Sequence, residues 1–252
     1  MSPLFFAPPF FFIIAYVFSM LGMGGSQLYI PILFWLGMDF KTEAIPLGML
    51  LNVVNSSSAA LTYARRKLIA WRVAMPFALA MIVFAPLGVR LNITLPEEPL
   101  LVFFALFTAT AALLMLSGWK PGSGSMKPHT RFLVGLSTGG VLGTITGMIG
   151  RGGGSFIVPI LYMVGLAPRA AAATSSFIVT CSGVSSLIAH LSTSASPEWV
   201  VWLLSVAGVL LGSQLGSRRM ASHMDSHSVK KVFGIVLLAV AALILIKDVL
   251  LA

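Results

Sequence analysis

The residue best suited to chemistry in this chain is Arg151, a lone cation inside a long apolar run. A charge at the centre of such a run costs about 2.5–3.5 kcal/mol even on the lenient scale of membrane insertion. No acidic residue lies near it in the sequence. A guanidinium fork binds sulfonate, carboxylate or phosphate oxygens in bidentate fashion. We therefore predict that Arg151 binds an anion; the alternative is a side chain that reaches the membrane interface.

Arg151 belongs to one of two glycine clusters that interrupt apolar runs, at residues 22–27 and 150–155. Glycine permits left-handed backbone, and irregular backbone at membrane depth is tolerated only inside protein or beside water. The short helix expected after each break would direct free N–H groups back at the break, which suits an anion. The alternative is close helix packing through small residues. The candidate binding residues at the two breaks are Gly24, Gly25, Ser26, Gln27, Gly152, Gly153, Gly154 and Ser155. Packing alone is the role expected for Gly135, Gly139, Gly140, Gly143, Gly208 and Gly212.

Neutral polar side chains follow each break and extend the candidate site. Helical spacing places Asn52, Asn55 and Ser56 on one face, and Thr180 and Ser185 lie in the corresponding second run. Neutral donors suit an oxyanion that must be desolvated and later released. The alternative for each hydroxyl is a bond to its own helix. His190 ends an apolar run, and we expect it at the membrane interface.

The composition requires a membrane environment. Of 252 residues, 58% are apolar and 9% are charged, whereas soluble domains carry about 25% charged residues. This excludes soluble enzymes, secreted scaffolds and disordered chains. The net charge of +9 comes from basic residues in short loops between apolar runs, which indicates membrane orientation rather than nucleic-acid binding. With one cysteine, the chain forms no internal disulfide.

An internal repeat organises the apolar runs. The runs at 4–37 and 131–167 are too long for one straight helix, and they align with each other so that Pro31 pairs with Pro159. The same offset pairs Gly22 with Gly150 and Trp71 with Trp199 without a gap. A gapless register over this length predicts two homologous halves. We expect a first transmembrane repeat at 1–120, a linker at 121–128 and a second repeat at 129–252.

The distribution of charge predicts that the two halves have opposite topology. Basic residues concentrate in the loops 65–72, 120–131 and 218–231, which the positive-inside rule places in the cytoplasm. Two similar halves can satisfy this distribution of charge if each glycine-broken run is a hairpin that enters and leaves the membrane on the same side. The fold class is then an all-α polytopic membrane protein with two inverted-topology repeats, each with a hairpin-like first segment and three transmembrane helices. The alternative is eight simple helices.

The two glycine-rich segments, together with the size and the similar halves, resemble the TauE/SafE family of bacterial membrane transporters. The resemblance covers nearly the whole chain. It implies transport of sulfur-containing anions such as sulfite, sulfoacetate or other organosulfonates across the bacterial cytoplasmic (inner) membrane, often outward. The first segment departs from the second, because Met23 replaces Arg151 and Ser26 replaces Gly154. The cation would then come from the second half alone.

We therefore expect a secondary transporter that exports a small sulfur-containing anion, held at the midplane between the two breaks. One half rocks against the other to give alternating access. The alternatives are a channel for anions or small solutes and a membrane scaffold without a substrate. No enzyme activity, catalytic residue, cofactor or metal is expected. The expected partners are the anion and the lipid bilayer, without nucleic acid, and a homodimer is an open alternative to the monomer.

Overall fold

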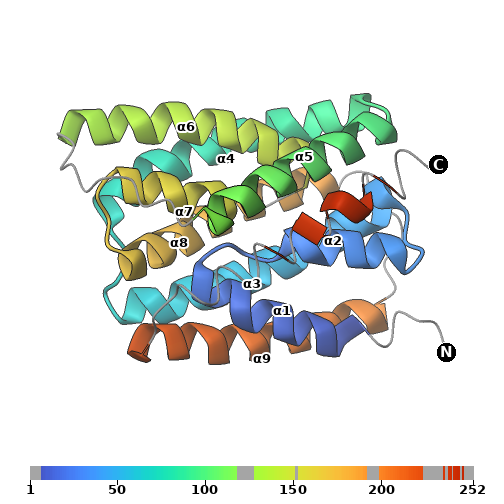
Figure 1. The fold of residues 1–252 in the computed structure, drawn as a ribbon, viewed down its shortest axis with the longest axis horizontal. Helices are drawn as coiled ribbons and strands as arrows, with labels where there is room; N and C mark the ends of the chain where they lie inside the picture. The colour runs from blue at the N-terminus through green and yellow to red at the C-terminus, as the bar shows by residue number, and fades with distance from the viewer. Residues whose placement is uncertain are drawn as a thin grey trace.

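The computed structural model describes residues 7–117, 128–150, 153–191 and 199–223, with a few positions between 235 and 246. Every regular element in these ranges is a helix (Figure 1), which confirms the all-α fold class. The elements are α1 (Ala7–Leu21), α2 (Ser26–Trp35), the π-turn η2 (Phe40–Ala44), α3 (Ile45–Arg65), α4 (Trp71–Thr94), α5 (Glu97–Leu116), α6 (Pro128–Met148), α7 (Gly154–Met163), α8 (Pro168–Leu191) and α9 (Trp199–His223).

Both long apolar runs are broken at their glycine clusters, as the sequence predicts. Gly22 and Gly24 have φ of 71° and 77° in the gap between α1 and α2. Gly150 and Gly153 have φ of 66° and 65° beside the gap between α6 and α7. Side chains other than glycine rarely adopt this left-handed backbone, so it ends the first helix of each run. The second helices, α2 and α7, have the same length and begin at equivalent positions of the repeat.

The broken runs form hairpins at opposite ends of the molecule (Figure 1). The outer ends of α1 and α2 lie at the right of that view, and the outer ends of α6 and α7 lie at the left. The connection from α3 to α4, the start of α6 and the end of α9 also lie at the left. The three basic segments named above therefore adjoin one end of the molecule.

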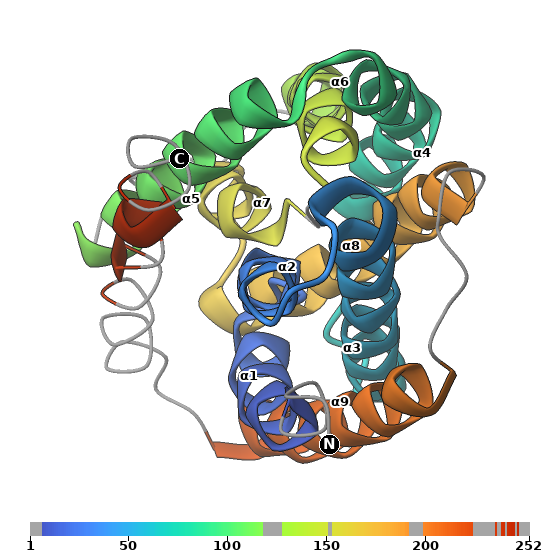
Figure 2. The same ribbon diagram turned by 90° about the vertical axis from the view of Figure 1, so that its right-hand side faces the viewer.

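The helices pack in pairs that join distant parts of the chain (Figure 2). α1 lies along α9, and α4 lies along α6. Glycines bring these pairs close: a Cβ on Gly212 of α9 would lie 2.2 Å from the Phe12 carbonyl oxygen. A Cβ on Gly143 of α6 would lie 2.9 Å from Met81 Cα of α4. The expected role in close helix packing is confirmed for Gly143 and Gly212.

We group six of these helices under two names, the α1–α3–α9 unit and the α4–α6–α8 unit. α9 packs against α1 and α3, while α4 packs against α6 and α8. The two units are joined mainly where α3 packs against α8, a contact as extensive as that of α4 with α8, and α1 also contacts α8. Figure 2 shows α2 and α7 between them, near the centre of the molecule. Each unit therefore combines helices from both halves of the sequence.

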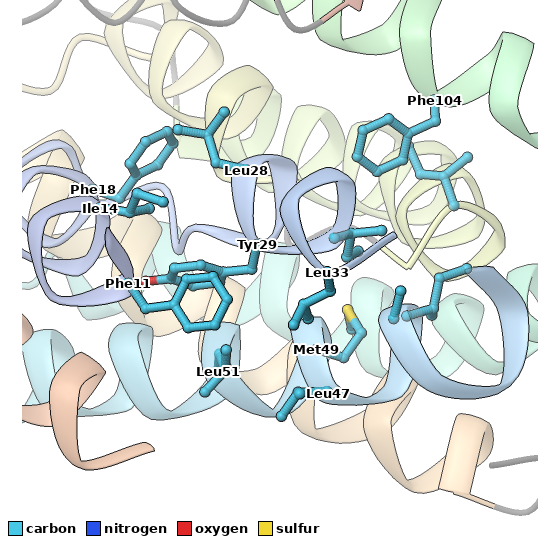
Figure 3. Close-up of a cluster of buried hydrophobic side chains, with 14 of the residues drawn as sticks. Phe11, Ile14, Phe18, Leu28, Tyr29, Leu33, Leu47, Met49, Leu51 and Phe104 are labelled. Carbon is cyan, nitrogen blue, oxygen red and sulfur yellow. The ribbon is translucent and has the colours of Figure 1, made fainter. Parts of the chain in front are cut away.

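The polarity of the molecule is that of a membrane protein. Large apolar side chains are exposed along α4, α6 and α9, while asparagine, serine and threonine side chains are buried between the inner helices. An apolar cluster that includes Phe11, Leu33 and Phe104 surrounds α2 (Figure 3). Among the described residues, four segments are long and apolar enough to span a membrane: Phe40–Arg65, Trp71–Thr94, Pro168–His190 and Trp199–Ser222.

Candidate functional site

The two glycine breaks meet at the centre of the molecule. The Ser155 hydroxyl, in the first turn of α7, donates a hydrogen bond of 2.5 Å to Gln27 Oε1, in the first turn of α2. Gly154 packs on the backbone of the other break, since a Cβ there would lie 2.4 Å from Met23 Cα. Gln27 and Ser155 are equivalent positions of the internal repeat.

Two asparagines of α3 hold the break between α1 and α2. Asn52 Oδ1 accepts hydrogen bonds from the backbone N–H groups of Gly25 at 3.0 Å and of Ser26 at 3.4 Å. Asn55 Nδ2 donates to the Gly24 carbonyl oxygen. The expectation that the first N–H groups of α2 are available to a ligand is therefore wrong for Gly25 and Ser26. The asparagine side chain caps the helix in place of an anion.

The break between α6 and α7 is built differently. Thr180 is the repeat equivalent of Asn52, and its hydroxyl donates to the Ser176 carbonyl oxygen of its own helix at 2.7 Å. Gly153 precedes α7 in the left-handed conformation, and its carbonyl oxygen accepts from Phe156 N at 3.0 Å. The two breaks differ at the residue before the second helix, since φ is 65° at Gly153 and 173° at the equivalent Gly25. Arg151 and Gly152 lie outside the described residues.

Two further predicted site residues bond to helix backbone. The Ser56 hydroxyl donates to the Val53 carbonyl oxygen of its own helix at 3.3 Å. The Ser185 hydroxyl donates to the Ile82 carbonyl oxygen of α4 at 2.8 Å, so it joins α8 to α4. The structure thus brings together Gly24, Gly25, Ser26, Gln27, Asn52, Asn55, Gly154 and Ser155.

Side chains from other helices contact backbone carbonyl oxygens in the last turns of α1 and α6, the two helices that precede the breaks. The Tyr63 hydroxyl donates to the Ser19 carbonyl oxygen of α1 at 2.7 Å. His190 Nε2 lies 3.2 Å from the Gly147 carbonyl oxygen of α6. Ser19 and Gly147 are again equivalent positions of the repeat. His190 is buried against α6, and the Gly147 carbonyl oxygen beside it also accepts a hydrogen bond from Gly150 N at 3.5 Å.

Sequence reasoning missed Tyr29, which is fully buried beside the first break. Its ring fills the space beside Gly25, where a Cβ would lie 2.5 Å from Tyr29 Cε2. The edge-to-face partner is Phe11, with ring centroids 5.2 Å apart (Figure 3). A signal was present in the sequence: Tyr29 follows Gly25 by one helical turn, and Ile157 stands at the equivalent position of the second half.

Prolines add to the polar character of both breaks. Pro31 lies inside α2 and Pro159 inside α7. Proline has no N–H, so it cannot donate the helical hydrogen bond to the carbonyls of Gln27 and Ser155. Backbone and side-chain oxygens, amides and hydroxyls are therefore concentrated where the hairpins meet. Such neutral groups can bind a small polar solute in an otherwise apolar helix bundle.

Comparison with known proteins places the chain in a family. The family model described as Sulfite exporter TauE/SafE matches residues 8–244. A probable membrane transporter protein of Xylella fastidiosa is 28% identical over 91% of this chain and 90% of its own length. A probable membrane transporter protein of Sinorhizobium fredii is 30% identical over 84% of this chain and 87% of its own length. Another, of Bacillus subtilis, is 25% identical over 88% of this chain and 90% of its own length. No solved structure matches the chain. The chain therefore belongs to the sulfite exporter TauE/SafE family of membrane transporters.

Proposed function

We propose that the chain is a secondary transporter that exports small sulfur-containing anions such as sulfite, sulfoacetate or other organosulfonates. The observation that carries this proposal is the meeting of two glycine breaks at the Gln27–Ser155 hydrogen bond. Broken helices at the membrane midplane are where secondary transporters bind their substrates. The description of the matching family supports a sulfur oxyanion as the substrate class.

In this proposal the anion binds closer to α7 than to α2. Asn52 already occupies the N–H groups of Gly25 and Ser26, whereas Thr180 bonds to its own helix. Arg151 adjoins α7 in the sequence and supplies the cation. The start of a helix adds N–H donors and a positive dipole end, both of which favour an anion. The remaining contacts come from Gly152, Gly153, Gly154, Ser155, Gln27 and Asn55.

The proposed arrangement in the membrane follows from the hairpins at opposite ends of the molecule. Residues 1–120 and 129–252 form repeats of inverted topology in the bacterial cytoplasmic membrane, joined by the linker 121–128. The end that adjoins the loops 65–72, 120–131 and 218–231 faces the cytoplasm. An inside-negative potential then drives export, by about 2.3 kcal/mol per charge for each 100 mV.

In this proposal the two units named above move relative to each other, in place of the two sequence halves. α1 lies along α9 and α4 along α6, so a motion of one half against the other would separate closely packed helices. Relative motion of the α1–α3–α9 unit and the α4–α6–α8 unit leaves these pairs intact. It acts instead at the crossing of α3 with α8 and at the Gln27–Ser155 hydrogen bond between the hairpins.

The test is thermal stability of the purified protein with sulfite, sulfoacetate, taurine, sulfate, phosphate, acetate and chloride. We expect a higher Tm with a sulfur anion, because a ligand that binds only the folded state stabilises it. Arg151→Met should abolish the shift, whereas Arg169→Met, which removes an exposed cation from the first turn of α8, should retain it. A shift that survives in Arg151→Met contradicts the role of this arginine.

Transport into liposomes completes the test. Saturable flux with counterflow identifies a carrier, and flux without counterflow identifies a channel. A protein that shows neither a thermal shift nor flux with any sulfur anion contradicts the proposed substrate class. That result would favour a scaffold role.

A further inference from the structure

Three buried polar atoms around Gly24 and Gly25 have no hydrogen-bond partner among the described residues. They are the Tyr29 hydroxyl, Asn52 Nδ2 and Asn55 Oδ1. All three side chains are 0% exposed. A buried polar atom without a hydrogen-bond partner destabilises the folded state. About nine in ten or more of the buried polar groups in proteins have at least one such partner. A cluster of three on one structural feature therefore requires an explanation.

The backbone of the break fixes which atom each asparagine presents. Asn52 Oδ1 accepts from Gly25 N and Ser26 N, so the second arm of this amide is the donor Nδ2. Asn55 Nδ2 donates to the Gly24 carbonyl oxygen, so the second arm of this amide is the acceptor Oδ1. The Tyr29 hydroxyl, beside Gly25, can both donate and accept. The cluster thus offers a fixed donor, a fixed acceptor and one group of either kind.

The second half of the chain provides an internal comparison. At the positions equivalent to Tyr29, Asn52 and Asn55 it has Ile157, Thr180 and Gly183. These residues accompany a break and a short helix of the same length and register. Because a short helix of the same length and register forms without the three polar groups, the formation of such a helix does not account for them.

We propose that Tyr29, Asn52 and Asn55 form a neutral subsite that binds an O–H or N–H group of the transported anion. This inference rests on the proposed function and specifies its substrate class. Asn55 Oδ1 can be bonded only by a donor, and a fully deprotonated oxyanion has none. The preferred ligand is therefore a sulfur oxyanion with its own proton, such as hydrogensulfite or a hydroxy- or aminoalkanesulfonate.

The experiment compares 2-hydroxyethanesulfonate with propane-1-sulfonate, which has a methyl group in place of the hydroxyl. Binding is measured by calorimetry on the purified full-length protein. We expect the hydroxysulfonate to bind about tenfold more tightly, because its analogue leaves polar groups of the site unpaired. Tyr29→Phe should lose most of this preference. It retains the ring that packs on Gly25 and Phe11, so the variant should fold.

Tyr63→Phe is the matched control, since Tyr63 is equally buried but its hydroxyl donates to the Ser19 carbonyl oxygen. We expect Tyr63→Phe to lower Tm and to keep the preference for the hydroxysulfonate. Tyr29→Phe should keep or raise Tm and lose most of this preference. Equal binding of the two sulfonates by the unmodified protein overturns the subsite alone, as does an unchanged preference in Tyr29→Phe. Binding of neither sulfonate overturns the proposed function for sulfonates, and the subsite with it.

Discussion

At the scale of single residues, Asn52 and Thr180 show how one side chain decides what a helix terminus can do. Both occupy the same position of the repeat. The longer amide of Asn52 reaches the N–H groups of Gly25 and Ser26 on another helix, whereas the Thr180 hydroxyl bonds to Ser176 of its own helix. The first break is therefore held by a side chain of the protein, and its donors are occupied.

Substitution of these two residues tests that difference. Asn52→Ala should lower the free energy of unfolding by about 1–3 kcal/mol, because it removes the amide oxygen that accepts from two buried N–H groups. Thr180→Ala should change it by less than about 0.5 kcal/mol, since the Ser176 carbonyl retains its helical environment. The measurement is Tm in detergent with both variants side by side. Equal losses would show that Asn52 does not cap α2 as described.

Part of the candidate site could be predicted at this scale. The spacing of Asn52 and Asn55 placed both on one helix face, and the structure brings both to the first break. Tyr29 was missed, because an aromatic residue in an apolar run is usually packing material and its difference from the equivalent Ile157 is a weak signal. Its distinguishing property is the position of its hydroxyl beside Gly25, which depends on how α2 folds back against α1 and α3.

At the scale of elements, glycines determine how closely the helices approach. A Cβ on Gly212 would lie 2.2 Å from the Phe12 carbonyl oxygen, a distance that real Cβ atoms do not adopt. A Cβ on Gly140 of α6 would lie 3.6 Å from the Phe84 ring, which is ordinary van der Waals contact. The same residue type therefore serves a close helix crossing at Gly212 and an uncrowded position at Gly140.

The two glycines should respond to alanine with opposite signs. Gly212→Ala must separate α1 from α9, and overpacking of this kind costs about 1–3 kcal/mol. Gly140→Ala has room for its methyl group and gains up to about 1 kcal/mol from higher helix propensity. Thermal unfolding in detergent gives both values. A neutral Gly212→Ala variant would be inconsistent with the close packing of α1 on α9.

The sequence predicted the elements better than their partners. The offset between the halves and the glycine clusters predicted two broken runs, and α2 and α7 begin at matching positions. The pairing of α1 with α9 and of α4 with α6 could not be predicted. Apolar helix faces are not directional, and glycines mark a close approach without identifying the helix on the other side.

At the scale of the whole molecule, the two units combine helices from both halves of the chain and meet mainly where α3 packs against α8. A Cβ on Gly183 of α8 would lie 2.9 Å from Val53 Cγ2 of α3, which places these positions within disulfide distance between the units. Within the α1–α3–α9 unit, the hydroxyl oxygens of Thr62 and Ser217 are 3.2 Å apart. The two pairs allow cross-links between units and within one unit to be compared.

Both cysteine pairs would be introduced with Cys181→Ser, which removes the native thiol. Oxidation of Val53→Cys/Gly183→Cys should stop flux in liposomes, and reduction should restore it, because this disulfide joins the units that move. Oxidation of Thr62→Cys/Ser217→Cys should leave flux largely unchanged. Continued flux through the first cross-linked protein would show that α3 and α8 do not move relative to each other.

The pairing of α1 with α9 also has a consequence for synthesis of the protein. α1 leaves the ribosome early, but its packing partner is among the last helices to be translated. Until α9 is inserted, the face of α1 that later covers Gly208, Gly212 and Gly216 has only lipid or the insertion machinery against it. The first repeat therefore cannot mature as a finished domain while the second is being made. A ribosome that stops before α9 leaves an incomplete bundle, which is a ready substrate for membrane quality control.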